Sequence, residues 1–374
     1  MAMTHRERIL AALRNQPHDY LAWAPRIDLW YDAHAKAGTL PQEYQGWSMW
    51  DIVRDIGGGL QGTRGVIYRE QLKDIEVKVR QEPHQTITEY HTPLGVVTTE
   101  LALTDLLDET GTRAYETGKM FKRVEDYPVI EYIFEHTEII PAYDEFHRLA
   151  QQIGEDGVVH GQMGYSPMHR VMREIMGYER FVYEYADHRD QVEHLYEVMM
   201  DHGRRIARVA ADSPATVITS CGNWSDMIHT PTLFRRYYVP WFQELGALLH
   251  PRGKLIQSHI DGEMRRLLDA TLEAGIDVGE AFSPAPMTSL TCADLRQAWG
   301  DRIAVWGGVP SQLFTESYTD EEFDAYILKM FREIQPGQNF VVGTGDNLPI
   351  HAVFHRLARI TELVQHYGKL PMRL

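Results

Sequence analysis

The sequence of 374 residues has only two cysteines, Cys221 and Cys292, too few for a disulfide framework or a cysteine-rich zinc site. It has no run of about 18 apolar residues, the length needed to span a bilayer. Basic residues are also scarce, since 37 Lys+Arg stand against 53 Asp+Glu and the formal net charge is −16. Binding to nucleic acid or to anionic lipid normally needs a basic face, so neither partner is expected. The charged N-terminal sequence MAMTHRERILAAL is not typical of a signal peptide, and a cytoplasmic protein is the default expectation.

Strand-like and helix-like segments alternate regularly from about residue 157 onward. Longer amphipathic segments separate short β-rich runs at 157–162, 215–221, 254–260, 275–282, 302–308 and 339–345. This alternation predicts βα units and a parallel sheet. With an early strand at 21–30, it favours an α/β fold of the (β/α)8 TIM barrel type. A doubly wound sheet is the alternative, but no Gly-rich dinucleotide turn follows the first strand.

The N-terminal part of the chain adds two features to the predicted barrel. An amphipathic helix that Thr4 could cap opens the sequence and forms a helical extension. Residues 74–103 contain alternating stretches such as IEVKVRQ and TITEYHT, which predict a small antiparallel β insertion. No linker rich in Pro, Gly or Ser divides the chain, so residues 1–374 are expected to form a single domain.

Polar side chains gather where the predicted strands end, which in a parallel barrel is the face that carries chemistry. His259 and Asp261 lie two residues apart on one strand, so imidazole and carboxylate point to the same side. Asp346, at a later strand end, could complete a metal site, with Glu280 as a fourth ligand. One imidazole with carboxylates suits zinc, manganese or iron(II). A His-x-Asp pair is nevertheless a weak motif, because most such pairs are hydrogen-bonded loop residues.

Other candidate residues have two interpretations each. Arg26 and Asp28 could bind a carboxylated ligand or pair with each other. The aromatic residues Trp224, Phe282 and Trp306 could line a flat apolar pocket or cover the core. His160 is more often a core histidine with its hydrogen bonds satisfied, and Cys221 is more often a small buried apolar residue than a nucleophile.

Several motifs resemble a known family. THRERILAAL, TPTLFRRYYVPWFQEL, GKLIQSHIDG, LLDATLEAGID, IAVWGGVPSQLF and VVGTGDNLP occur in this order. In this they are similar to the uroporphyrinogen decarboxylase superfamily, which includes cobalamin-dependent methyltransferases. The resemblance covers nearly the whole chain, is clearest from about residue 214, and implies an α/β barrel.

Two departures from the family patterns separate its branches. The decarboxylases carry an Arg-Gln-Ala-Gly-Arg run that grips a polycarboxylated tetrapyrrole. Here PRIDLWYDAHAK offers Arg26 and no second arginine before Arg54, which argues against that substrate. The methyltransferases carry His-x-Cys and a later Gly-Cys-Gly as a zinc motif. Here aspartate stands at both cysteine positions, as Asp261 and Asp346, which indicates a changed metal site.

The resemblance therefore implies a methyltransferase that moves a methyl group between a small methylated compound, such as a methyl ether, and a corrinoid protein. Zinc is the favoured divalent metal, held by His259, Asp261 and Asp346, and a homodimer is expected by analogy. The residues expected to take part in proton transfer are His160 and Glu280, and Asp28 is expected to do so in a decarboxylase. The residues expected to bind substrate are Arg26, Asn223, Trp224, Phe282 and Trp306. Two alternatives stay open: a decarboxylase of a smaller acidic substrate, with Arg26 as its anion anchor, and a non-catalytic barrel that binds a tetrapyrrole or corrinoid.

Overall fold

The computed structural model describes residues 2–104 and 114–374 and forms two compact units. Unit 1 comprises residues 1–65, 144–162 and 214–374, and unit 2 comprises residues 66–143 and 163–213. Compact units within one chain need not be separate domains, so the expected single domain stays a prediction. In the described residues, no helix has both the length and the apolar character required to cross a membrane.

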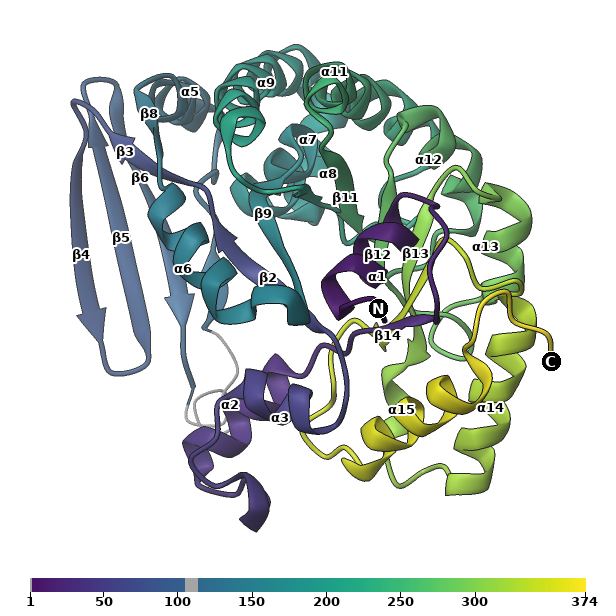
Figure 1. The fold of residues 1–374 in the computed structure, drawn as a ribbon. Coiled ribbons are helices and arrows are strands. Elements are labelled where there is room, and N and C mark those ends of the chain that lie inside the picture. Colours follow the sequence, from purple (N-terminus) through teal and green to yellow (C-terminus); the bar gives the residue numbers. More distant parts are fainter. Residues whose placement is uncertain (1, 105–113) are drawn as a thin grey trace. The chain divides into compact units, whose positions relative to one another are not determined.

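Unit 1 is built on a sheet with eight strands in the described residues (Figure 1). In spatial order the strands are β1 (Ala22–Trp23), β14 (Phe340–Gly345), β13 (Ala304–Pro310), β12 (Val278–Phe282), β11 (Leu255–His259), β10 (Val217–Cys221), β9 (Gly157–Tyr165) and β2 (Leu60–Val66). All neighbours from β1 through β14 to β10 pair in parallel. The Gly59 N–H, just before β2, donates to the Trp23 carbonyl at 2.8 Å and joins the two ends of this order. The predicted α/β barrel class is confirmed.

Most helices of unit 1 lie between its strands along the chain, and α1 precedes the first strand. The helices are α1 (His5–Leu13), α2 (Asp28–Ala37), α3 (Met49–Asp55), α6 (Tyr143–Ile153), α10 (Pro231–Leu233), α11 (Val239–Leu249), α12 (Leu268–Ala274), α13 (Cys292–Trp299), α14 (Asp320–Glu333) and α15 (His355–Tyr367). Thr4 caps α1 as predicted, and Glu7 returns a hydrogen bond to form a capping box.

The apolar core of unit 1 closes one end of the barrel. Ile9, Ala12 and Leu13 of α1 belong to a buried cluster with residues at the amino ends of the strands, among them Val217 and Val278. Burying this apolar surface is the main favourable term in folding. Because α1 covers the amino ends, the carboxyl ends of the strands are the ones available to carry polar groups.

Two early strands differ from what the sequence predicts. The expected strand at 21–30 is a strand only over Ala22–Trp23, because Pro25 interrupts it and α2 begins at Asp28. The sequence of strand β2 does not alternate between apolar and polar residues. Its glycines allow its backbone to approach β9 closely. A Cβ on Gly65 would lie 2.2 Å from the His160 carbonyl oxygen, so no larger residue fits there without movement.

Unit 2 contains the predicted antiparallel insertion. A sheet in the order β4 (Glu76–Glu82), β5 (Gln85–Thr92), β6 (Gly95–Ala102) and β7 (Tyr115–Gly118) pairs in antiparallel fashion. A separate pair is formed by β3 (Tyr68–Leu72) and β8 (Thr137–Pro141). The helices are α5 (Tyr127–Glu135), α7 (Pro167–His169), α8 (Tyr178–Asp187) and α9 (Arg189–Asp212). The insertion confirms the prediction and extends beyond residue 103 to include β7.

Candidate functional site

The site lies at the carboxyl ends of the unit 1 strands, where the strand register places polar residues side by side. His259 ends β11 and pairs with Glu280 of β12. Residues paired in this way point to the same face of a sheet, so the imidazole and the carboxylate are neighbours. Nδ1 of His259 accordingly donates to Oε2 of Glu280 at 2.6 Å.

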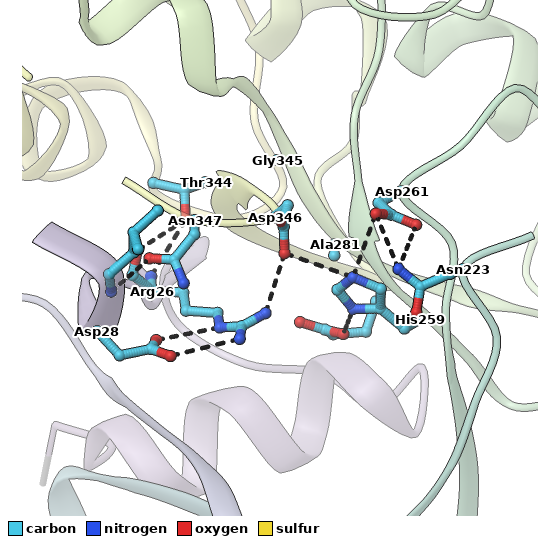
Figure 2. Close-up of polar contacts among 12 residues, drawn as sticks. Arg26, Asp28, Asn223, His259, Asp261, Ala281, Thr344, Gly345, Asp346 and Asn347 are labelled. Carbon is cyan, nitrogen blue, oxygen red and sulfur yellow. Dashed lines mark hydrogen bonds and ion pairs between the residues drawn. The ribbon is translucent and has the colours of Figure 1, made fainter. Parts of the chain in front are cut away.

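Two aspartates approach His259 from its other nitrogen (Figure 2). Nε2 of His259 lies 3.6 Å from Oδ2 of Asp261 and 3.4 Å from Oδ1 of Asp346. The side chain of His259 is 9% exposed, whereas those of Asp261 and Asp346 are 25% and 45% exposed. The structure therefore brings the three predicted metal ligands together, with the imidazole buried and the aspartates open to solvent.

An arginine links this group to the start of α2. Nη1 of Arg26 lies 3.0 Å from Oδ1 of Asp346, and its Nε and Nη2 donate to Asp28 at 3.0 and 3.3 Å (Figure 2). Of the two interpretations left open by the sequence, the structure has Arg26 and Asp28 paired with each other. Arg26, Asp28, His259, Asp261, Glu280 and Asp346 are called the carboxylate cluster below.

The carboxylates determine the charge of the buried histidine. Burial by itself would lower the pKa of His259, but Glu280, Asp261 and Asp346 outweigh it and raise the pKa well above its ordinary 6.5. Burial would likewise raise the pKa of Glu280, but His259 and Arg26 lower it to about 2. In the protein without a cation, an imidazolium is thus surrounded by carboxylates.

The backbone around the cluster adopts unusual conformations. Asn223, Ala281 and Asp346 have φ angles of 50°, 63° and 75°, a region that residues other than glycine rarely adopt. Each of them lies within or just after a strand that supplies the site, and Ala281 lies at the register shift between β12 and β13. Strained backbone of this kind is concentrated at functional sites, which supports this end of the barrel as the place of function.

A second polar group lies inside the barrel and carries no charge. Nε2 of Gln257 donates to Nδ1 of His160 at 2.9 Å and to Oγ1 of Thr219 at 3.2 Å. Burial lowers the pKa of His160 to about 4, so its imidazole is neutral near pH 7. Within residues 2–104 and 114–374, Nε2 of His160 and Oε1 of Gln257 have no hydrogen-bond partner. These three residues are called the neutral layer, and a proton-transfer role for His160 stays a prediction.

The aromatic residues expected at the substrate site are buried. Trp224 packs edge-on against Phe234 and Phe242, and Trp306 donates from Nε1 to the Ala24 carbonyl at 3.2 Å. Phe282 is also buried. Their surroundings are those of core side chains, and their predicted contact with a ligand stays a prediction.

Two other predicted residues have partners within the cluster. Asn223 donates from Nδ2 to Asp261 at 3.1 Å, which orients that carboxylate. Asp28 is almost fully buried and holds Arg26. Substrate binding by Asn223 and proton transfer by Asp28 stay predictions.

One residue of the site is missing from the sequence-based prediction. Gln61 of β2 donates from Nε2 to Oε1 of Glu280 at 2.7 Å, and both side chains are buried. Strand β2 has two glycines and no alternation of apolar and polar residues, so its position in the barrel is hidden in the sequence. Locating the strand would have identified Gln61 as a polar side chain in a barrel interior.

The fit of a metal ion can be tested against these distances. In the part of the chain that the structure describes, no three His, Cys, Asp or Glu side chains are gathered tightly enough to hold a cation as they stand. Ligand atoms about 2.1 Å from a tetrahedral zinc ion lie about 3.4 Å from one another. The 3.4 and 3.6 Å distances from Nε2 of His259 match that spacing. Two of the three spacings of such a ligand set are thus in place, and to hold a divalent cation Asp261 and Asp346 would turn toward one point, with Asp346 sharing its carboxylate with Arg26.

Comparison with protein families establishes what kind of chain this is. The family model described as Uroporphyrinogen decarboxylase (URO-D) matches residues 116–367, which is more than half of the chain. The chain belongs to the uroporphyrinogen decarboxylase family, as the resemblance of its motifs predicts, and is an enzyme of that superfamily. Among curated proteins, no sequence matches it.

Solved structures show where the fold recurs. A methyltransferase from Methanosarcina mazei is similar with a TM-score of 0.61 and 12% sequence identity, covering 98% of this chain and 99% of that one. At this identity the similarity establishes the fold alone. A 3-keto-D-glucoside 4-epimerase from E. coli has a TM-score of 0.36 and 11% identity over 64% of this chain and 87% of its own. A score that low has no bearing on the function.

Proposed function

We propose that the protein is a metal-dependent methyltransferase that moves a methyl group between a small methylated compound, such as a methyl ether, and a corrinoid protein. The observation that carries the proposal is the convergence of His259, Asp261 and Asp346 at the open end of the barrel. Family membership and a full-length fold shared with a methyltransferase support it.

The charge balance of the carboxylate cluster also supports a cation. Four carboxylates, those of Asp28, Asp261, Glu280 and Asp346, outnumber the guanidinium groups near them, which are Arg26 and, 3.8 Å from Asp28, Arg64. A cluster with this excess of negative charge is stabilised either by a protonated His259 or by a divalent cation in the place of that proton. Oxygen ligands with one imidazole suit zinc, manganese or iron(II), and we take zinc as the leading choice.

The residues of this chain would divide the work as follows. Nε2 of His259 and the carboxylates of Asp261 and Asp346 would hold the cation, which when bound supplies Lewis acidity toward an oxygen of the substrate. Glu280 keeps His259 in place, and Asn223 does the same for Asp261. In the proposed reaction the methyl–oxygen bond would break with its electron pair left on oxygen, and a cobalt(I) corrinoid on a partner protein would supply the electron pair that takes up the methyl group.

Glu280 and His160 are the two residues expected to supply a proton to the departing oxygen. Glu280 has both oxygens engaged, and its pKa of about 2 keeps it ionised at neutral pH. Glu280 is therefore better suited to accept the hydrogen bond that holds His259 than to donate a proton. His160 is neutral, with an unpartnered Nε2, but it is buried inside the barrel.

The direct test is methyl transfer to cobalamin, used as the probe in place of a corrinoid protein. Reduced cobalamin(I) and a panel of methyl ethers are incubated with the protein, and the visible spectrum reports methylcobalamin. Wild type is expected to form it with at least one donor, and His259→Ala is expected to form none. His355→Ala, which removes an exposed histidine paired with Asp320, is the matched control. Equal rates in wild type and His259→Ala would contradict the proposal.

A decarboxylase is the second candidate, favoured by the description of the matching family. It would use Arg26 as an anchor for an acidic substrate. Against it, the guanidinium is already neutralised by Asp28 and Asp346 at 3.0 Å each. This candidate predicts turnover without metal and loss of substrate binding in Arg26→Ala, whereas the methyltransferase loses turnover when metal is removed.

A further inference from the structure

Gln61 forms a hydrogen-bonded chain with two residues of the carboxylate cluster. Its amide donates to Oε1 of Glu280 at 2.7 Å, and the other oxygen of the same carboxylate accepts from Nδ1 of His259 at 2.6 Å. Taken as whole residues, Gln61, Glu280 and His259 are 5%, 5% and 7% exposed, so water does not readily replace either bond. Each oxygen of Glu280 therefore has one strong partner, and rotation of the carboxylate would break a buried hydrogen bond.

We infer that Gln61 is a positioning residue of the proposed metal site, which holds Glu280 so that Glu280 in turn orients His259. With Nδ1 engaged as the donor to Glu280, Nε2 is the nitrogen that faces Asp261 and Asp346. Partners that fix the second nitrogen of a histidine ligand determine its orientation and its basicity toward a metal. The inference rests on the proposed function for the identity of the cation, but not for the hydrogen bonds.

The position of Gln61 in the barrel suits this role. In the strand order, β9, β10 and β11 stand between β2 and β12, so the bond from Gln61 to Glu280 crosses the barrel interior. The backbone of β2 is held closely against β9, since a Cβ on Gly62 would lie 3.0 Å from Cα of Val159. Gln61 is thus mounted on a strand with little freedom to shift, as precise positioning requires.

If Gln61 had a merely structural role, its amide would only donate a hydrogen bond to a buried carboxylate that would otherwise lack one. Gln257 offers the matched comparison, because it is also a buried glutamine of the barrel interior but contacts His160 and Thr219 rather than the carboxylate cluster. Replacing either glutamine by leucine removes one buried amide and keeps a similar volume. Only the change at Gln61 frees an oxygen of Glu280.

The first measurement is the affinity for Zn²⁺, determined by competition with a chromophoric chelator. Gln61→Leu is expected to weaken zinc binding about 10–100-fold, the usual effect of losing a partner behind a metal ligand. Gln257→Leu is expected to change it less than about threefold, because it leaves those partners in place. Thermal unfolding identifies variants that are folded at the temperature of the assay.

The second measurement needs no metal. The Nδ1 proton of His259, in a 2.6 Å bond to a buried carboxylate, should give a downfield proton NMR signal that exchanges slowly with water. His259→Ala assigns the signal by removing it. Gln61→Leu is expected to broaden the signal or speed its exchange, and Gln257→Leu to leave it unchanged.

The two measurements distinguish the possible failures. If both are unchanged in Gln61→Leu, or equally affected in the two leucine variants, the inference is overturned. If wild type binds none of zinc, manganese and iron(II), the proposed function fails, while the proton signal still decides whether Gln61 positions His259.

Discussion

Two buried histidines in the same barrel have opposite charge states. His259, in the carboxylate cluster, has its pKa raised well above 6.5, whereas His160, in the neutral layer, has its pKa lowered to about 4. Burial penalises the charged form of both. The difference arises because three carboxylates contact His259, while the hydrogen-bond partner of His160 is the amide of Gln257.

This comparison teaches that the neighbours of a buried histidine, rather than its burial, decide what it can bind. Surroundings that keep His259 protonated also suit a divalent cation, since a metal takes the place of a proton on a histidine ligand. For His160, the attraction of Glu280 favours the charged form, but burial and Arg26 oppose it and prevail. Each prediction below tests whether this difference is real.

The largest effect is expected from removing each histidine in turn. His259→Ala should weaken zinc binding more than about 100-fold, because losing a ligand costs more than losing a partner behind one. His160→Ala should leave zinc affinity nearly unchanged. Isothermal titration calorimetry with Zn²⁺ measures the affinity of both variants. Similar losses of zinc affinity in the two would contradict the difference between the carboxylate cluster and the neutral layer.

The pH dependence of the free energy of unfolding sharpens the comparison without any metal. Glu280 and His160 have lowered pKa values in the folded protein, so stability should rise with pH from about 2 toward their ordinary values of 4.5 and 6.5. His259 has a raised pKa, so its contribution is complete below 6.5 and is lost as pH rises through the folded value. Urea unfolding of metal-free protein should therefore show maximal stability near pH 6.5.

Zinc provides the control for the alkaline side of that profile. A bound cation replaces the proton on His259, so saturating zinc should remove the decline in stability above pH 6.5 and leave the acid side in place. Stability of the metal-free protein that keeps rising above pH 6.5 would show that His259 is not held as an imidazolium.

The smallest effect is expected at Arg26, the cation of the carboxylate cluster. Arg26→Gln frees Asp346 from an ion pair at 3.0 Å and should raise zinc affinity by up to about fivefold, because a partly exposed ion pair contributes about 0–1 kcal/mol. Competition with a chelator measures the change. A large loss of zinc affinity would mean that the arginine is needed to assemble the site.

Much of the fold could be predicted from the sequence because the late strands are apolar runs separated by long amphipathic helices. Strands β10, β11, β12 and β14 lie within the predicted ranges, and β13 runs two residues beyond its predicted end. The early strands could not be placed in the same way. Strand β1 has two residues, and β2 depends on Gly62 and Gly65 to approach β9, which no pattern of apolar residues reveals.

The candidate site shows the same difference between what could be predicted from the sequence and what could not. His259, Asp261 and Asp346 could be found because polar groups at strand ends converge in any parallel barrel, and the structure brings them together. Whether Arg26 faces a ligand or Asp28 depended on side-chain packing, which the sequence does not contain. Gln61 could not be predicted as a site residue because its partner, Glu280, is 219 residues away in the chain and contacts it only across the barrel.

Metal analysis of the purified protein tests the central claim most directly. After equilibration with equimolar zinc, manganese and iron(II) and removal of free ions, wild type should retain close to one equivalent of a divalent metal, and His259→Ala should retain essentially none. A wild-type protein that holds no metal, or an alanine variant that holds as much as wild type, would contradict the account.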